Sequence, residues 1–316
     1  MGIHKKLFDE GLIERGQYNY IEMINDKSKV SVFYELRSLL YVGILFFTGG
    51  VAYFGYNHFT HVGHLLAMLS LSATLIFVLY KVFKLSHPFS AKKVIVEHNY
   101  FDYFVLFVAL LWISLWTYIQ LYFGLLEILI RPFSFVSTLL FFGLAYRFDN
   151  TAVLVLGITA LAASVGLTVS PLDWINGGYV SLNSLYYSSI VLGLALILIS
   201  YVTILRGIKN HFRSTYLHFG YLLLISGLLV AEIETGSWGF IVMNILIGVL
   251  ISFYHWKTRE FLFFFYGNLL FYIVFNHALY KSLGMDFFIL GLYHYPLTLL
   301  GYIVFIVSNK KQFSDD

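Results

Sequence analysis

One apolar stretch of the chain carries four polar residues that could form a site: Gln120, Tyr122, Glu127 and Arg131. Glu127 and Arg131 are four residues apart, so on a helix they face each other and can form an ion pair. A charged side chain inside a membrane is costly and usually functional, whereas near the membrane surface it can extend into water. The alternatives are therefore a binding site and a solvated turn. Asn57 is a further polar candidate for such a site.

Three histidines, His58, His61 and His64, recur at every third position. Imidazoles can bind transition metals, but steps of three on a helix spread the side chains over about 120°. No carboxylate lies nearby in the sequence, and the chain has no cysteine. We therefore expect histidines at the membrane interface, with no metal and no cofactor.

Glu232, His277 and His294 are secondary candidates, because they lie inside or near later apolar segments. Glu232 and Glu234 are two residues apart, so on a helix they point in different directions. Either carboxylate could gate protons or cations if it lined a cavity, although a solvated helix end is the simpler interpretation. His277 and His294 fit the usual role of polar groups in membrane helices, which is hydrogen bonding between helices. Pro296 should loosen the backbone beside His294.

The elements that position these residues must be membrane helices. Hydrophobic residues make up 59% of the 316 positions and charged residues 12%, against about 25% charged residues in a soluble protein. We predict an all-α polytopic bundle. A bilayer core of about 30 Å needs roughly 20 apolar residues per helix. Ten segments meet that need: 39–57, 62–83, 101–121, 125–147, 151–169, 185–205, 215–233, 237–255, 261–280 and 286–307.

The segments outside these predicted spans are too short to form a separate hydrophobic core. Residues 1–38 are rich in charge and form a small helical module, which is too short to bury much core alone. We expect it to pack on the membrane surface, on the cytoplasmic loops, or on another protein, which is either a partner or a second copy of the chain. The remaining divisions are a first membrane half at 39–169, an outer loop at 170–184, a second half at 185–308 and a tail at 309–316.

The positive charges predict the orientation in the membrane. With the amino terminus in the cytoplasm, eighteen of the 20 Lys and Arg residues fall on the cytoplasmic side, as the positive-inside rule requires. Ten spans then return the carboxyl terminus to the cytoplasm. The formal charge of +3 is too small to argue for nucleic acid, and the expected environment is a lipid bilayer.

Three segments resemble a known family of bacterial membrane proteins, catalogued as domain of unknown function 2157. They are the Gly-Leu-Ile turn at residues 11–13, the first span at 37–59, and residues 117–126, where Gln120 and Tyr122 match a glutamine-tyrosine motif. The resemblance covers about residues 5–165, and it implies an integral inner-membrane protein without naming a reaction. The chain departs from the family where His58 follows Asn57 in place of a tryptophan.

Three functions remain open from the sequence. The first is a transporter or small-molecule-binding membrane protein, with a pocket near the outer ends of the first, third and fourth spans. The second is a scaffold or sensory subunit that binds a partner through residues 1–38. The third is a membrane enzyme acting on a lipid-linked substrate. No nucleophile elbow, phosphate loop or HExxH helix is present, so the first two are favoured over catalysis.

Overall fold

The computed structural model describes residues 58–93, 100–166, 182–283 and 287–313, with residues 14–18 and a few single positions nearer the amino terminus. The first expected span, Asn57, most of the module at 1–38 and most of the loop at 170–184 lie outside the described residues. The chain divides into two units, Met1–Ala67 and Met68–Asp316. Apart from the start of the first long helix, the elements below belong to the second unit.

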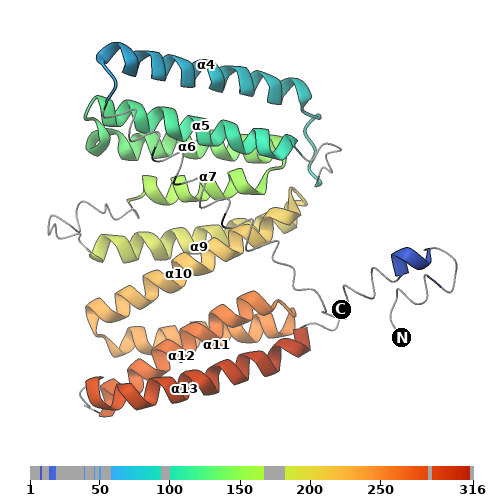
Figure 1. Ribbon diagram of the computed structural model, residues 1–316. Coiled ribbons are helices and arrows are strands. Elements are labelled where there is room, and N and C mark those ends of the chain that lie inside the picture. The colour runs from blue at the N-terminus through green and yellow to red at the C-terminus, as the bar shows by residue number, and fades with distance from the viewer. Residues whose placement is uncertain are drawn as a thin grey trace. The chain divides into compact units, whose positions relative to one another are not determined.

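The described part of this unit is built from helices (Figure 1) and contains no strand. The α-helices are α4 (His61–Leu85), α5 (Phe101–Tyr122), α6 (Leu126–Phe148), α7 (Thr151–Ser164), α9 (Leu182–Arg206), α10 (Arg213–Thr235), α11 (Trp238–Lys257), α12 (Phe261–Leu283) and α13 (Phe287–Lys310), and the short 3₁₀ turns are η1 (Asn210–Phe212) and η2 (Lys311–Phe313).

Seven of the described helices, α4, α5, α6, α9, α10, α11 and α12, are long and apolar enough to cross a membrane. Their outer surfaces expose large apolar side chains, among them Leu205 at 84%, Phe253 at 69% and Leu198 at 65%. Apolar surface on this scale is unfavourable in water and natural in lipid. The prediction of a polytopic helical membrane protein is therefore confirmed.

The expected fifth span, 151–169, is shorter than predicted. Helix α7 has 14 residues, so at 1.5 Å per residue it measures roughly 21 Å, less than the bilayer core. It ends because Gly166 adopts a left-handed conformation with φ +84°, the usual helix terminator. The apolar composition of the sequence could not predict that α7 ends at this residue. Helix α13 follows the expected tenth segment, although the side chains of its first turns lie outside the description.

Hydrogen bonds and an ion pair between turns hold the ends of several helices close together. The backbone nitrogen of Lys209 donates to the Ala91 carbonyl at 2.7 Å, and Arg147 Nη1 donates to the His87 carbonyl at 2.6 Å. Arg213 also pairs with Glu260. We call this the basic end, comprising residues 86–93, 147–150, 207–213 and 257–260. It collects basic side chains that lie far apart in the sequence: Lys92, Lys93, Arg147, Lys209, Arg213, Lys257 and Arg259.

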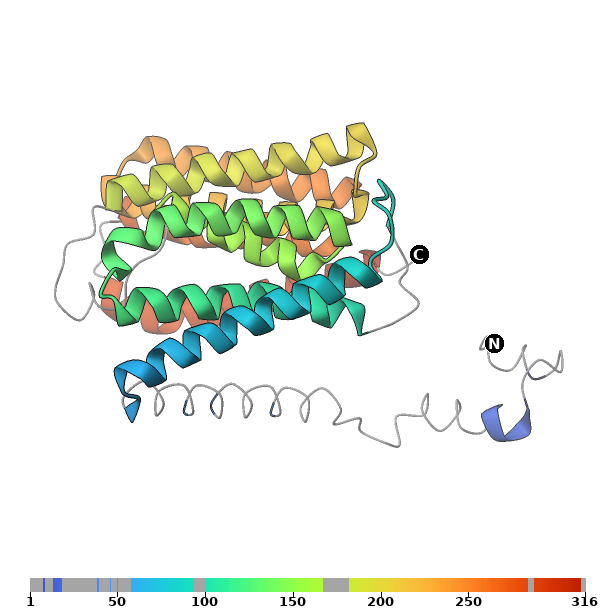
Figure 2. The same ribbon diagram turned by 90° about the horizontal axis from the view of Figure 1, so that it is seen from above.

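Two helix pairs pack at backbone distance, α9 with α10 and α11 with α12. Both pairs lie side by side in Figure 1, and α9 also lies beside α10 in Figure 2. A Cβ on Gly193 would lie 2.6 Å from the Leu224 nitrogen. A Cβ on Gly267 would lie 2.6 Å from the Ser252 nitrogen and 2.8 Å from the Gly248 carbonyl oxygen. Small residues permit this close approach in membrane helices. At these points the two helices of each pair touch through their main chains.

Candidate functional site

The predicted stretch at 112–133 separates into a buried amide and an exposed cation. Gln120 lies in the last turn of α5 and is only 2% exposed, and its Nε2 has no hydrogen-bond partner among the described residues. Tyr122 is half-buried and makes an edge contact with the Phe123 ring, with centroids 5.0 Å apart. The side chain of Glu127 and all of Asn57 lie outside the description, so the structure does not test the expected Glu127–Arg131 pair.

Arg131 is exposed and reaches the carboxyl end of α7. A Cβ on Gly166 would lie 3.3 Å from Arg131 Nη2. A cation beside a helix carboxyl terminus is favourable, because the last carbonyl groups carry partial negative charge. Arg131 therefore has a structural role at a helix end that its position in the sequence did not indicate.

A buried polar cluster forms instead between α10, α11 and α12. Glu232 is 2% exposed, and its Oε1 lies 2.5 Å from His277 Nδ1. Its Oε2 accepts a hydrogen bond from Asn244 Nδ2 at 2.5 Å. The same amide also lies 3.3 Å from the Leu228 carbonyl oxygen. We call Glu232, Asn244 and His277 the Glu232 cluster. Glu234 is exposed, so the solvated interpretation fits Glu234 and is wrong for Glu232.

The neighbourhood of this cluster carries one further cation. Lys281 lies one helical turn after His277 on α12 and donates to the Gly236 carbonyl at the end of α10. Its ammonium also lies 4.9 Å from the centre of the Trp238 ring. Lys281 therefore closes the α10–α11 turn. In the described part of the chain, His277 is the ion-pair partner of Glu232.

His294, the other secondary candidate, contacts the residue next to His277. Its Nε2 lies 2.8 Å from Asn276 Oδ1, and Asn276 Nδ2 donates to the Tyr272 carbonyl at 2.7 Å. Consecutive residues of α12 thus engage α13 through Asn276 and α10 through His277. Hydrogen bonding between helices was the sequence-based expectation for both histidines, and the geometry agrees with it.

The basic end holds a second carboxylate cluster, which the sequence did not indicate. Arg213 at the start of α10 places two guanidinium nitrogens on the two oxygens of Glu260. His255 Nδ1 lies 2.9 Å from Glu260 Oε2, and Tyr221 Oη lies 2.8 Å from His255 Nε2. We call these four residues the Glu260 cluster. Arg213 and Glu260 are 47 positions apart, so no local spacing could reveal the pair.

The charge of Glu260 is fixed by its surroundings. Burial by itself would raise the pKa of the Glu260 carboxyl, but hydrogen bonds and positive charge from Arg213, together with His255, outweigh burial and lower this pKa below its ordinary value. The carboxylate is therefore ionised throughout the physiological range.

A third polar contact joins two turns of the basic end. Asp149 Oδ1 lies 3.0 Å from Lys209 Nζ and 2.6 Å from His211 Nε2. The side chains of Lys209 and Asp149 are 1% and 4% exposed. This buried pair joins the α6–α7 turn to the α9–α10 turn, so it holds two helix hairpins together.

The three histidines near the start of α4 differ in their burial. His58 and His61 are exposed, whereas His64 is 8% exposed and packs against the Phe59 ring, with centroids 6.0 Å apart. Across the residues that the structure describes, no group of three or more potential ligands is close enough to hold a metal ion.

Comparisons with protein-family models, with curated proteins and with solved structures found no match to this chain. The site must therefore be interpreted from its own geometry.

Proposed function

We propose that the protein is a membrane transporter in which the Glu232 cluster couples proton binding to the handling of a small molecule. One observation carries the proposal: a carboxylate that is 2% exposed lies within a membrane-spanning helix and is bound by a histidine. An ionisable residue in such a position is expensive to maintain and typically marks a proton or ion pathway. Histidine is suited to the role because imidazole gains and loses a proton near neutral pH.

The exposure of the two partners suggests the direction of proton entry. The His277 side chain is 36% exposed, while that of Glu232 is 2% exposed. In the proposed cycle a proton arrives from water at His277, and the pair then shares it with the buried carboxylate. Neutralising Glu232 weakens its hold on Asn244, because a charged acceptor binds a donor more strongly than a neutral one. Proton binding would thereby loosen α11 from α10.

Purified protein in liposomes tests this function. A pH-sensitive dye inside the vesicles would report proton movement while a panel of small molecules is added outside. We expect at least one compound to drive proton movement in the wild type and not in Glu232→Gln. The matched control is Glu234→Gln, two residues away and exposed. Equal proton movement in wild type and Glu232→Gln, for every active compound, would contradict the proposal.

We further propose that the basic end faces the cytoplasm of a bacterial cell, with both termini on that side. The gathering of basic turns that lie far apart in the sequence supports this orientation. Because the chain has no cysteine, labelling of a single introduced thiol reports its side without background. Lys92→Cys and Thr258→Cys should label from the cytoplasm, and Ser237→Cys from outside. If positions 92 and 258 were labelled from opposite sides of the membrane, the proposed orientation would be contradicted.

A further inference from the structure

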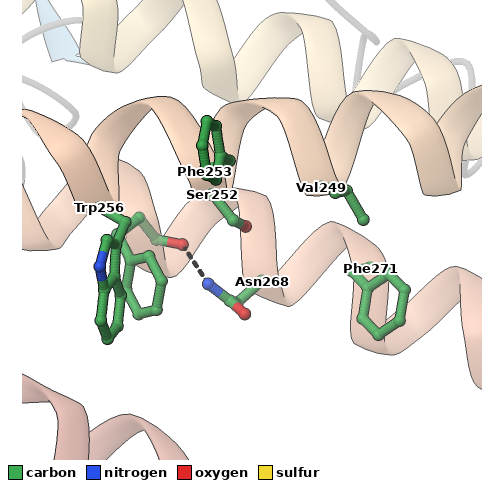
Figure 3. Close-up of a pocket in the computed structure, with 7 residues that line it drawn as sticks. Val249, Ser252, Phe253, Trp256, Asn268 and Phe271 are labelled. Atoms are coloured by element: carbon green, nitrogen blue, oxygen red, sulfur yellow. Dashed lines mark hydrogen bonds between the residues drawn. The ribbon is translucent and has the colours of Figure 1, made fainter.

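Two adjoining cavities follow helix α12. The first, of about 390 Å³, lies between α11 and α12 and is drawn in Figure 3 with Ser252, Trp256 and Asn268 on its wall. The second, of about 440 Å³, lies between α12 and α13 and includes Tyr272 and Tyr302. Asn268 and Phe271 line both cavities. The two spaces therefore share a wall, and each falls within the size range of a small-ligand site, about 300–1,000 Å³.

Flat aromatic surfaces dominate the second cavity. The Tyr272 and Tyr302 rings stack with centroids 4.7 Å apart and an interplanar angle of 22°. Phe271 and Phe275 stack with centroids 5.6 Å apart at 18°. Phe275 remains 49% exposed, so its ring can also stack on a flat molecule, and offset stacking adds to the free energy of apolar burial.

The polar groups of the cavities are uncharged or histidine, and most are already satisfied. Asn268 Nδ2 donates to the Phe264 carbonyl at 2.9 Å, which leaves its side-chain oxygen as an acceptor. Thr298 bonds the Tyr272 hydroxyl at 3.0 Å. The Tyr302 hydroxyl is buried and has no partner in the described part of the chain. A buried donor without an acceptor costs free energy, so an occupant that displaces the groups covering this hydroxyl and offers an oxygen acceptor would relieve that cost.

The cavity walls also exclude ionised occupants. Among the described residues that line the two cavities, none is Lys, Arg, Asp or Glu. Asn268 is the eighth residue of α12 and Tyr302 the sixteenth of α13, so both lie well inside their helices. An unpaired charge at that depth would be strongly disfavoured.

We propose that the cavities along α12 bind an uncharged, membrane-soluble molecule with a flat ring that carries a carbonyl oxygen. The ring lies against the stacked aromatic side chains, and the carbonyl oxygen accepts a hydrogen bond from Tyr302. This inference rests on the proposed function, for which it names the class of small molecule. The cavities and the Glu232 cluster are adjacent in sequence, because Asn276 on the cavity wall directly precedes His277 of the cluster.

Gly301 offers a direct way to fill the space. It lines the second cavity, and a Cβ added there would meet no atom within 4 Å. Gly301→Leu should therefore occupy the cavity without displacing a helix. Gly143 on α6 has equally open surroundings and lines neither cavity, so Gly143→Leu is the matched control.

The experiment uses the full chain in lipid nanodiscs and a short-chain benzoquinone as the probe. Trp256 lines the first cavity, so its fluorescence should be quenched saturably, and Trp256→Phe should remove most of the saturable signal. We expect Gly301→Leu to weaken binding at least tenfold, Tyr302→Phe about fivefold to tenfold through loss of one hydrogen bond, and Gly143→Leu less than twofold.

Three outcomes would overturn the inference: quenching that never saturates, equal binding by Gly301→Leu and wild type, or equal displacement of the probe by a linear alcohol of similar length. The last result would identify an alkyl chain as the occupant. Binding is measured without a pH gradient, so it is independent of proton coupling. Saturable binding together with unchanged proton movement in Glu232→Gln would leave this inference standing while the proposed function fails.

Discussion

Glu232 and Glu260 are both carboxylates bound by a histidine, yet they lie at opposite ends of the α10–α12 bundle and are neutralised differently. Glu260 pairs through both oxygens with Arg213, a permanent cation. Glu232 pairs with His277 and accepts from the neutral amide of Asn244. Arginine keeps its charge at every accessible pH, whereas histidine does not.

Under the proposed function, the difference separates a structural ion pair from a proton-binding site. The Glu260 cluster joins the start of α10 to the α11–α12 turn through a pair whose cation is permanent. The Glu232 cluster joins the same three helices through a histidine, the group proposed to receive the proton. Within the described residues, the basic end has more charged residues than the end that holds the Glu232 cluster. The proposed proton-dependent step, however, requires a group that can gain and lose a proton, not a large number of charges.

Removing the permanent cation should have the largest effect. Arg213→Gln leaves Glu260 partly buried without its main partner, and we expect a loss of about 2 kcal/mol and a fall in Tm of about 6 °C, measured by thermal unfolding in detergent. Arg206→Gln makes the same chemical change at an exposed position and should move Tm by less than about 2 °C. Similar shifts for the two variants would show that the ion pair carries little stability.

Arg213→Lys should fall between these results. Lysine retains the positive charge but not the planar pair of donors that matches a carboxylate. We expect about half of the loss seen for Arg213→Gln, or about 1 kcal/mol, in the same thermal assay. A Tm equal to wild type would mean that charge alone, rather than the two-point geometry, holds the ion pair.

The pH dependence of Glu260 follows from the direction of its shift. Its folded-state pKa is lowered from the ordinary 4.5, so its stabilisation is complete above about pH 4.5 and is lost as pH falls through the lowered value. The Tm difference between wild type and Glu260→Gln should stay constant from pH 8 to 5 and shrink only below that range. A difference that changes between pH 8 and 6 would contradict a permanently ionised Glu260.

The smallest stability effect should come from Glu232→Gln. Glutamine keeps the size of the side chain and an oxygen for Asn244, and the partner that it leaves, His277, is 36% exposed, so no uncompensated charge is left fully buried. We expect Tm to move by less than about 2 °C. The same thermal assay measures it, and a fall as large as that of Arg213→Gln would make the Glu232–His277 contact a second structural ion pair.

Hydropathy predicted the membrane helices well, because lipid imposes length and apolar composition directly on the sequence. It could not place the end of α7, which depends on the conformation of Gly166. It also could not pair Arg213 with Glu260 or Asp149 with Lys209, since those contacts arise only when separate hairpins pack. Glu232 was a secondary candidate because it lies near the end of a span; its burial by Asn244 and His277 is a property of three helices together.

The backbone contact between Gly248 and Gly267 has a mechanical consequence. Two helices that touch along their main chains have almost no free volume between them at that point, so they resist compression and hinge poorly. Compliance in this region must then reside where side chains leave space, between α12 and α13. A molecule that enters beside Tyr302 would therefore displace α13, while α11 and α12 would move together as one rigid unit.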